Sequence, residues 1–108
     1  MTTQAISPDT AGRDGGKNAF YSGSFTSNGN AAVVTLGVKP RYVKVFNQTD
    51  TITWEWSEGM AATNAFKTTS SALAVDTGTA ILDNGDGTFT ISSGAAGTSK
   101  ALTWIAFC

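Results

Sequence analysis

The chain has 108 residues, a formal net charge of −1 and no histidine. Its length indicates one domain with a modest hydrophobic core. A chain without net positive charge lacks the basic field that attracts nucleic acid, and no apolar run approaches the roughly 20 residues that span a membrane. Charged residues make up only 14% of the chain, which leaves a surface of small polar and apolar groups, as in a protein partly covered by neighbours.

Residue types that usually perform chemistry are scarce. The lack of histidine removes the commonest general base and the commonest transition-metal ligand. Cys108 is the single cysteine, so it can build neither an internal disulfide nor a zinc site, and it indicates folding in a reducing cytoplasm. No phosphate-binding loop with Gly-Lys-Ser/Thr is found. These features favour a structural or binding module without a cofactor over an enzyme.

The first 18 residues differ from the rest of the chain. Their apolar residues are sparse and aperiodic, and the basic and apolar blocks of a secretion signal are missing. We therefore predict a flexible polar arm over residues 1–18 and one β-sandwich domain over residues 19–108. Within the arm, Ile6, Pro8 and Arg13 are the residues that we expect to contact a partner.

Strand signals begin at residue 19. The aromatic-rich residues 19–26 precede Asn28-Gly29, a pair that favours a tight hairpin turn because both central residues need a positive φ. Residues 31–36 (AAVVTL) are the expected next strand. Gly37 ends that strand.

An aromatic hairpin over residues 41–56 carries the clearest signal. Ile52, Trp54 and Trp56 alternate with polar residues, which predicts a half-buried strand with both indoles on one face. A polar turn at residues 47–50 joins this strand to the preceding one. We expect the two indoles to lie in the core, each burying roughly 150–250 Å². A sugar-stacking platform is the alternative for the same two side chains.

The bases of this hairpin lie among acidic residues. Arg41 and Lys44 are near Asp50, Glu55 and Glu58 in the sequence. Cross-strand pairing is therefore favoured over phosphate binding.

The second half of the chain contains another hairpin signal. Residues 79–82 and 88–92 are expected strands that flank residues 83–87 (DNGDG), a predicted tight turn. The oxygen atoms of this loop also suit Ca²⁺, although the spacing and closing Glu of an EF-hand are missing. Residues 60–69 are ambiguous between a helical turn and a bent strand, and residues 93–99 are expected to form a loop.

The closing strand, residues 101–107 (ALTWIAF), is apolar on both faces. A strand of this kind is either central in a sandwich or buried at a subunit interface. We predict a homotrimer with Leu102, Trp104, Ile105 and Phe107 at the interface.

The spacing of all these signals predicts the fold class. About eight short strands are separated by frequent turns, and no long stretch has the period of an amphipathic helix. The expected fold is all-β: an antiparallel β-sandwich or a jelly-roll-like barrel.

Several strings of the sequence resemble those of a known group of proteins. They are LGVKPRYVKVFN (36–47), Trp54-Glu55-Trp56, Gly59-Met60, AFKT (65–68) and the strand around Trp104. In these strings the chain resembles small structural proteins of tailed bacteriophage virions. The resemblance covers most of the chain after Asn30, and the arm before Phe20 departs from it.

The resemblance implies a capsid decoration, or cement, protein with a β-sandwich fold and a trimeric state. Such a protein is made in the cytoplasm of the host bacterium and binds the major capsid protein between capsomers on the capsid surface. Binding only the assembled shell would stabilise the head by mass action. The alternative is a carbohydrate-binding module of a phage fibre or tail, which exposure of Trp54, Trp56 or Tyr42 would favour.

Overall fold

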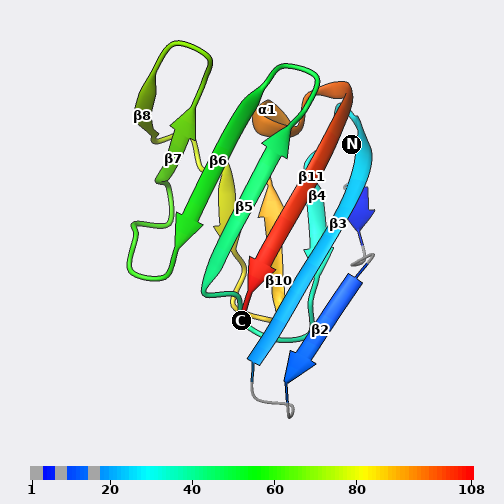
Figure 1. The fold of residues 1–108 in the computed structure, drawn as a ribbon. Helices are drawn as coiled ribbons and strands as arrows, with labels where there is room; N and C mark the ends of the chain where they lie inside the picture. Colours follow the sequence, from blue (N-terminus) through cyan, green and yellow to red (C-terminus); the bar gives the residue numbers. More distant parts are fainter. Residues whose placement is uncertain (1–3, 7–9, 15–17) are drawn as a thin grey trace.

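The structure, a computed structural model, describes residues 4–6, 10–14 and 18–108. In this part of the chain, a four-stranded sheet in the order β1-β4-β10-β9 packs against a seven-stranded sheet in the order β2-β3-β11-β5-β6-β7-β8 (Figure 1). The predicted β-sandwich is therefore confirmed. The sheets do not close into a barrel, so the barrel alternative is wrong, and the described strands outnumber the eight expected.

The smaller sheet consists of short strands. β4 pairs with β1 in parallel and with β10 antiparallel, and β10 pairs antiparallel with β9. The bounds are Gln4–Ile6 for β1, Ala32–Thr35 for β4, Ile81–Asp83 for β9 and Thr88–Ile91 for β10.

The larger sheet is antiparallel throughout. Its central strand β11 lies between β3 and β5, and its two edge strands are β2 and β8. The bounds are Thr10–Asp14 for β2, Asn18–Asn28 for β3, Tyr42–Asn47 for β5, Ile52–Ser57 for β6, Ala65–Thr68 for β7, Leu73–Asp76 for β8 and Thr98–Phe107 for β11.

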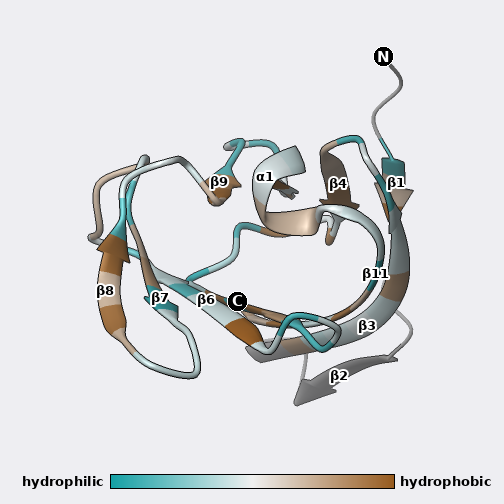
Figure 2. Ribbon diagram, turned by 90° about the horizontal axis from the view of Figure 1, so that it is seen from above, coloured by the Kyte–Doolittle hydropathy of each residue, from teal (hydrophilic) through white to brown (hydrophobic). Residues whose placement is uncertain are grey.

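The core lies between the two sheets, and alternation along each strand selects the side chains that enter it. Trp104 is 0% exposed, and its ring meets Phe89 of the smaller sheet edge-to-face, with 5.7 Å between ring centroids. Figure 2 shows the two sheets from above, with this space between them. The other large side chains that enter it from the larger sheet include Val43, Val45, Trp54, Trp56 and Leu102.

The aromatic hairpin has the predicted pairing. β5 and β6 are antiparallel neighbours, with Val43 opposite Trp56 and Val45 opposite Trp54. The turn between them is closed by Asn47, which is 2% exposed and whose Oδ1 accepts a hydrogen bond from the Asp50 N–H at 3.0 Å.

The Asn28-Gly29 turn does not close a hairpin, so that prediction is wrong. β3 pairs with β11 and β2, whereas β4 belongs to the other sheet. Gly29 does adopt a positive φ of 87°, but its N–H donates to the carbonyl of Gly97 at 3.0 Å. The turn therefore carries the chain from one sheet to the other.

The N-terminal segment differs from the predicted arm wherever the structure describes it. β1 and β2 are edge strands of the two sheets, and Ile6 is only 8% exposed because it packs into the core. Arg13 lies in β2 opposite Ala19. Pro8 is outside the described residues.

Besides β1 and β2, two further elements escaped the sequence patterns, the strand β8 and one short helix. β8 follows β7 in a hairpin, and β7 resolves the ambiguity of residues 60–69 in favour of a strand. In the expected loop over residues 93–99, Ser93–Ala96 forms the short helix α1, whose N-terminus is capped by Ser92 accepting from the Ala95 N–H at 3.1 Å.

Candidate functional site

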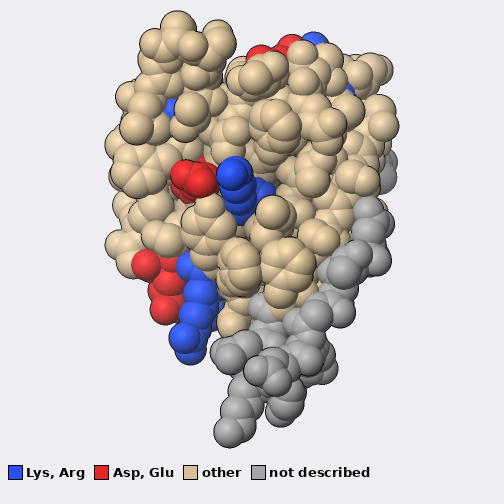
Figure 3. Space-filling model, in the orientation of Figure 1, with Lys and Arg blue, Asp and Glu red and all other residues tan. Residues whose placement is uncertain are grey.

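The candidate site is the outer face of the larger sheet, which is the face turned away from the smaller sheet. In Figure 3 this face is toward the viewer, and most of it is neither acidic nor basic. Alternation along β3, β11, β5 and β6 places on it Phe20, Tyr42, Lys44, Phe46, Thr53, Glu55, Thr103, Ile105 and Phe107.

An aromatic patch lies at one end of this face. Phe107 is 47% exposed, and its ring centroid lies 5.1 Å from that of Phe20 and 5.9 Å from that of Tyr42. The three rings come from adjacent strands, because Phe107 is opposite Phe20 on one side and Tyr42 on the other. Exposed aromatic clusters of this kind are typical of surfaces that bind another protein.

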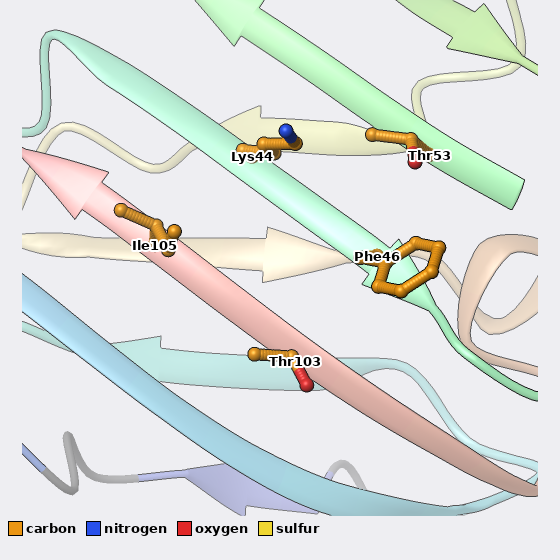
Figure 4. A pocket seen from close by; sticks show the side chains of 5 residues that line it. All are labelled: Lys44, Phe46, Thr53, Thr103 and Ile105. Atoms are coloured by element: carbon orange, nitrogen blue, oxygen red, sulfur yellow. The ribbon is translucent and has the colours of Figure 1, made fainter.

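A shallow hollow lies beside the patch. It has a volume of about 330 Å³ and is lined by Lys44, Phe46, Thr53, Thr103 and Ile105 (Figure 4). All five side chains point away from the smaller sheet. Its apolar walls and polar rim suit an apolar side chain that has a hydrogen-bonding group next to it.

Two opposite charges lie across from each other on the outer face. Lys44 and Glu55 are opposite each other on β5 and β6, which confirms the cross-strand placement expected for Lys44. The Tyr42 hydroxyl donates to Glu55 Oε1 at 2.8 Å. Burial, the hydrogen bond to Glu55 and the negative charge of Glu55 together raise the pKa of Tyr42 to about 12. Tyr42 therefore remains a neutral donor that keeps the Glu55 carboxylate close to the sheet.

The two tryptophans of the hairpin lie in the core, as predicted. Trp54 is 3% exposed and Trp56 is 6% exposed. The Trp54 indole N–H donates to Asp76 Oδ2 at 2.9 Å, and the Lys67 ammonium lies 5.7 Å from the centre of the Trp54 ring. Neither indole is available to stack on a sugar.

The pKa of Asp76 is lowered by these contacts. The largest contribution to the lowered pKa of Asp76 comes from the Gly78 N–H, which donates to Asp76 Oδ1 at 2.8 Å, and the hydrogen bond from Trp54 comes next. The nearby charge of Lys67 acts in the same direction. The carboxylate is thus held ionised and directed toward β6.

The loop over residues 83–87 is the turn of the β9–β10 hairpin, as predicted. Asp83 accepts from the Gly85 N–H at 3.0 Å, and Asp86 accepts from the Thr88 hydroxyl at 2.6 Å. The carboxylates are therefore engaged by donors of the turn itself. No group of three or more His, Cys, Asp or Glu that suits a metal ion occurs among the described residues, so the calcium alternative gains no support.

The closing strand divides the predicted interface residues into two sets. Leu102 is 1% exposed and Trp104 is 0% exposed, so placing them at a subunit interface is wrong: they fill the core of a single chain. Ile105 and Phe107 lie on the outer face. Among the described residues, the other exposed large apolar side chains are Phe66, Leu73 and Val75, which the sequence patterns did not single out.

Comparisons of the chain with protein-family models, with curated protein sequences and with solved structures found no match. The single helix that the structure describes has four residues, so no described helix is able to cross a bilayer.

Proposed function

We propose that this chain is a structural protein of a tailed-phage virion, namely a capsid decoration or cement protein. It binds the major capsid protein between capsomers on the capsid surface and stabilises the assembled head. The observation that carries the proposal is the outer face: a nearly uncharged sheet surface with an exposed aromatic patch and an adjoining hollow. The resemblance to such proteins, which covers most of the chain after Asn30, supports the same function.

The proposed mechanism needs no chemical step. A rigid sandwich that binds only the assembled shell shifts the equilibrium toward that shell, by about 4 kcal/mol per site at a free concentration a thousandfold above Kd. Burial of the aromatic patch and the hollow against protein surface contributes roughly 25 cal/mol per Å² of apolar area.

We further propose a homotrimer whose subunits meet at the aromatic patch, with Ile105 and Phe107 in the contact. The capsid contact then involves the rest of the outer face together with the N-terminal edge formed by β1 and β2, where an edge strand can pair with a strand of the partner. Ile6 supports this edge from within the core, and Arg13 of β2 remains a candidate contact residue.

A carbohydrate-binding module is the weaker alternative. Exposure of Trp54, Trp56 or Tyr42 would favour it, but both indoles are buried, and Tyr42 is half-buried with its hydroxyl donating to Glu55.

Copy number distinguishes the two functions. In virions purified from the phage that encodes the chain, quantitative mass spectrometry is expected to find it at a copy number comparable to that of the major capsid protein, because a cement protein occupies symmetric sites over the whole shell. A few copies per particle would indicate a fibre or tail component. Absence from the virion would refute the proposal.

The trimer has its own test. Sedimentation of the purified protein at micromolar concentration is expected to give a trimer, and Phe107→Lys is expected to give a monomer, because it places three like charges in the contact. Phe66→Lys is the matched control, since Phe66 and Phe107 are each 47% exposed. A wild-type monomer, or equal effects of both substitutions, would contradict the placement of this interface.

A further inference from the structure

The open edge of the larger sheet is unusually apolar. β8 is the last strand of that sheet, and its Leu73 and Val75 are 68% and 52% exposed. Phe66 of the neighbouring β7 lies opposite Val75 and is 47% exposed. These three are among the four exposed large apolar side chains of the described residues. Figure 2 shows β8 as a hydrophobic strand at the rim of the molecule.

β8 contains neither lysine nor proline, two residues that commonly protect an edge strand against pairing. Natural edge strands are commonly guarded by lysine, proline or a bulge. The single charged residue of β8 is Asp76, and its carboxylate accepts from Trp54 on β6 at 2.9 Å, which directs it back over the sheet. Lys67 of β7 is likewise drawn toward the Trp54 ring, 5.7 Å away. Neither charge covers the open edge.

The backbone of β8 is oriented for a further strand. The Thr69 N–H donates to the Ala72 carbonyl at 2.9 Å, which closes the β7–β8 turn. The direction of the backbone N–H and C=O groups alternates along an antiparallel ladder. Those of Ala74 therefore point toward β7, and those of Leu73 and Val75 point toward the open edge. No strand of the described residues pairs with that edge.

We propose that β8 pairs antiparallel with β8 of a second copy of this chain, about a twofold axis at Ala74. Leu73 then lies opposite the partner's Val75, and the outward backbone groups of both residues are satisfied in two equivalent hydrogen-bonded pairs. The two Ala74 residues are directly opposite each other, as a pair that exchanges no backbone hydrogen bonds. Asp76 falls opposite the partner's Ala72, so no like charges meet directly.

The self-complementarity of this register is the reason to choose a second copy over a foreign strand. The side chains of Leu73 and Val75, together with Phe66 of β7, form one continuous apolar strip with the same three side chains of the partner. A strip of this kind removes the exposed apolar surface of both copies at once, with a small residue at the crowded centre.

This contact does not depend on the proposed function, since it lies on a different part of the surface from the aromatic patch. β8 has only four residues, so the area buried is well below the roughly 1,000 Å² of a stable interface. The contact is therefore weak between free copies and strengthens where copies are held side by side, as neighbouring trimers would be on a shell.

Disulfide trapping tests the register. In a Cys108→Ser background, Ala74→Cys places two thiols directly opposite each other, where Cα atoms are about 4.5–5.5 Å apart and a disulfide can form. Ser71→Cys is the matched control: Ser71 is also exposed, but its two copies are roughly 20 Å apart in this register. Under mild oxidation, the covalent dimer of Ala74→Cys is expected to form at least roughly tenfold faster.

A third substitution tests the apolar strip. Adding Leu73→Lys to Ala74→Cys is expected to slow trapping by roughly tenfold, which corresponds to about 1.4 kcal/mol, without changing the melting temperature, because Leu73 is 68% exposed. Equal trapping at positions 71 and 74, or no effect of Leu73→Lys, would overturn the proposal. Trapping that persists in the monomeric Phe107→Lys variant would support this contact even if the trimer fails.

Discussion

Replacing Trp104 by alanine is expected to lower the free energy of unfolding by about 3–5 kcal/mol. Trp104 is 0% exposed and packs edge-to-face on Phe89, so its removal leaves a cavity where the two sheets meet. A domain of this size has a stability of roughly 5–15 kcal/mol, so the loss is a large fraction of the total. Trp54→Ala is expected to cost a similar amount, since it also removes the donor to Asp76.

Denaturant unfolding followed by circular dichroism measures this effect. Phe107→Ala is the control, because Phe107 is a large aromatic residue of the same strand that is 47% exposed. Its effect on the free energy of unfolding of the isolated chain is expected to be much smaller. Equal losses at Trp104 and Phe107 would show that the core does not lie on the face of β11 that the structure assigns to it.

Gly23→Ala is expected to destabilise the fold by about 1–3 kcal/mol through a steric conflict. Gly23 is opposite Trp104 in the β3–β11 pair, and a Cβ at Gly23 would lie 2.8 Å from Trp104 Nε1 and 2.9 Å from two carbons of the same ring. Either the indole moves within a packed core or the strands separate. Glycine is therefore required here by the close approach of an indole ring.

The chain contains a matched control for this substitution. A Cβ added at Gly94 in α1 would meet no atom within 4 Å, so Gly94→Ala is expected to be neutral or slightly stabilising. In a double-mutant cycle, the cost of Gly23→Ala is expected to vanish in the Trp104→Ala background, because the ring that causes the conflict is gone. An unchanged cost in that background would assign the effect to the backbone of β3.

Local patterns were sufficient where a feature depends on neighbours in the sequence. Alternation along residues 52–57 predicted that Trp54 and Trp56 share the buried face, because side chains of a strand alternate between its two faces. Turn chemistry predicted the β9–β10 hairpin, in which Gly85 and Gly87 adopt φ values of 82° and 85°. The apolar character of residues 101–107 left two alternatives, a central strand or a strand at a subunit interface, and the structure makes it central, between β3 and β5.

Part of the candidate site could be predicted in the same way. Phe107 and Ile105 were expected at a binding surface, and the structure places both on the outer face. The sequence could not group Phe20 and Tyr42 with Phe107, because each lies more than sixty residues before it. Strand pairing brings them together: Phe107 is opposite Phe20 on β3 and opposite Tyr42 on β5. The exposed strip on β8 was missed because a strand of four residues shows no clear period.

The remaining features were decided only by tertiary structure. Asn28-Gly29 has the composition of a hairpin turn, yet the strands on either side of it enter different sheets, since β3 gains its partner from β11 at the other end of the chain. Ile6 joins the core because parallel pairing with β4 satisfies the backbone of β1 while its side chain is buried. The sequence by itself determined which residues share a face of each strand. Packing of the two sheets determined which face is buried, because burial depends on partner strands that are distant along the chain.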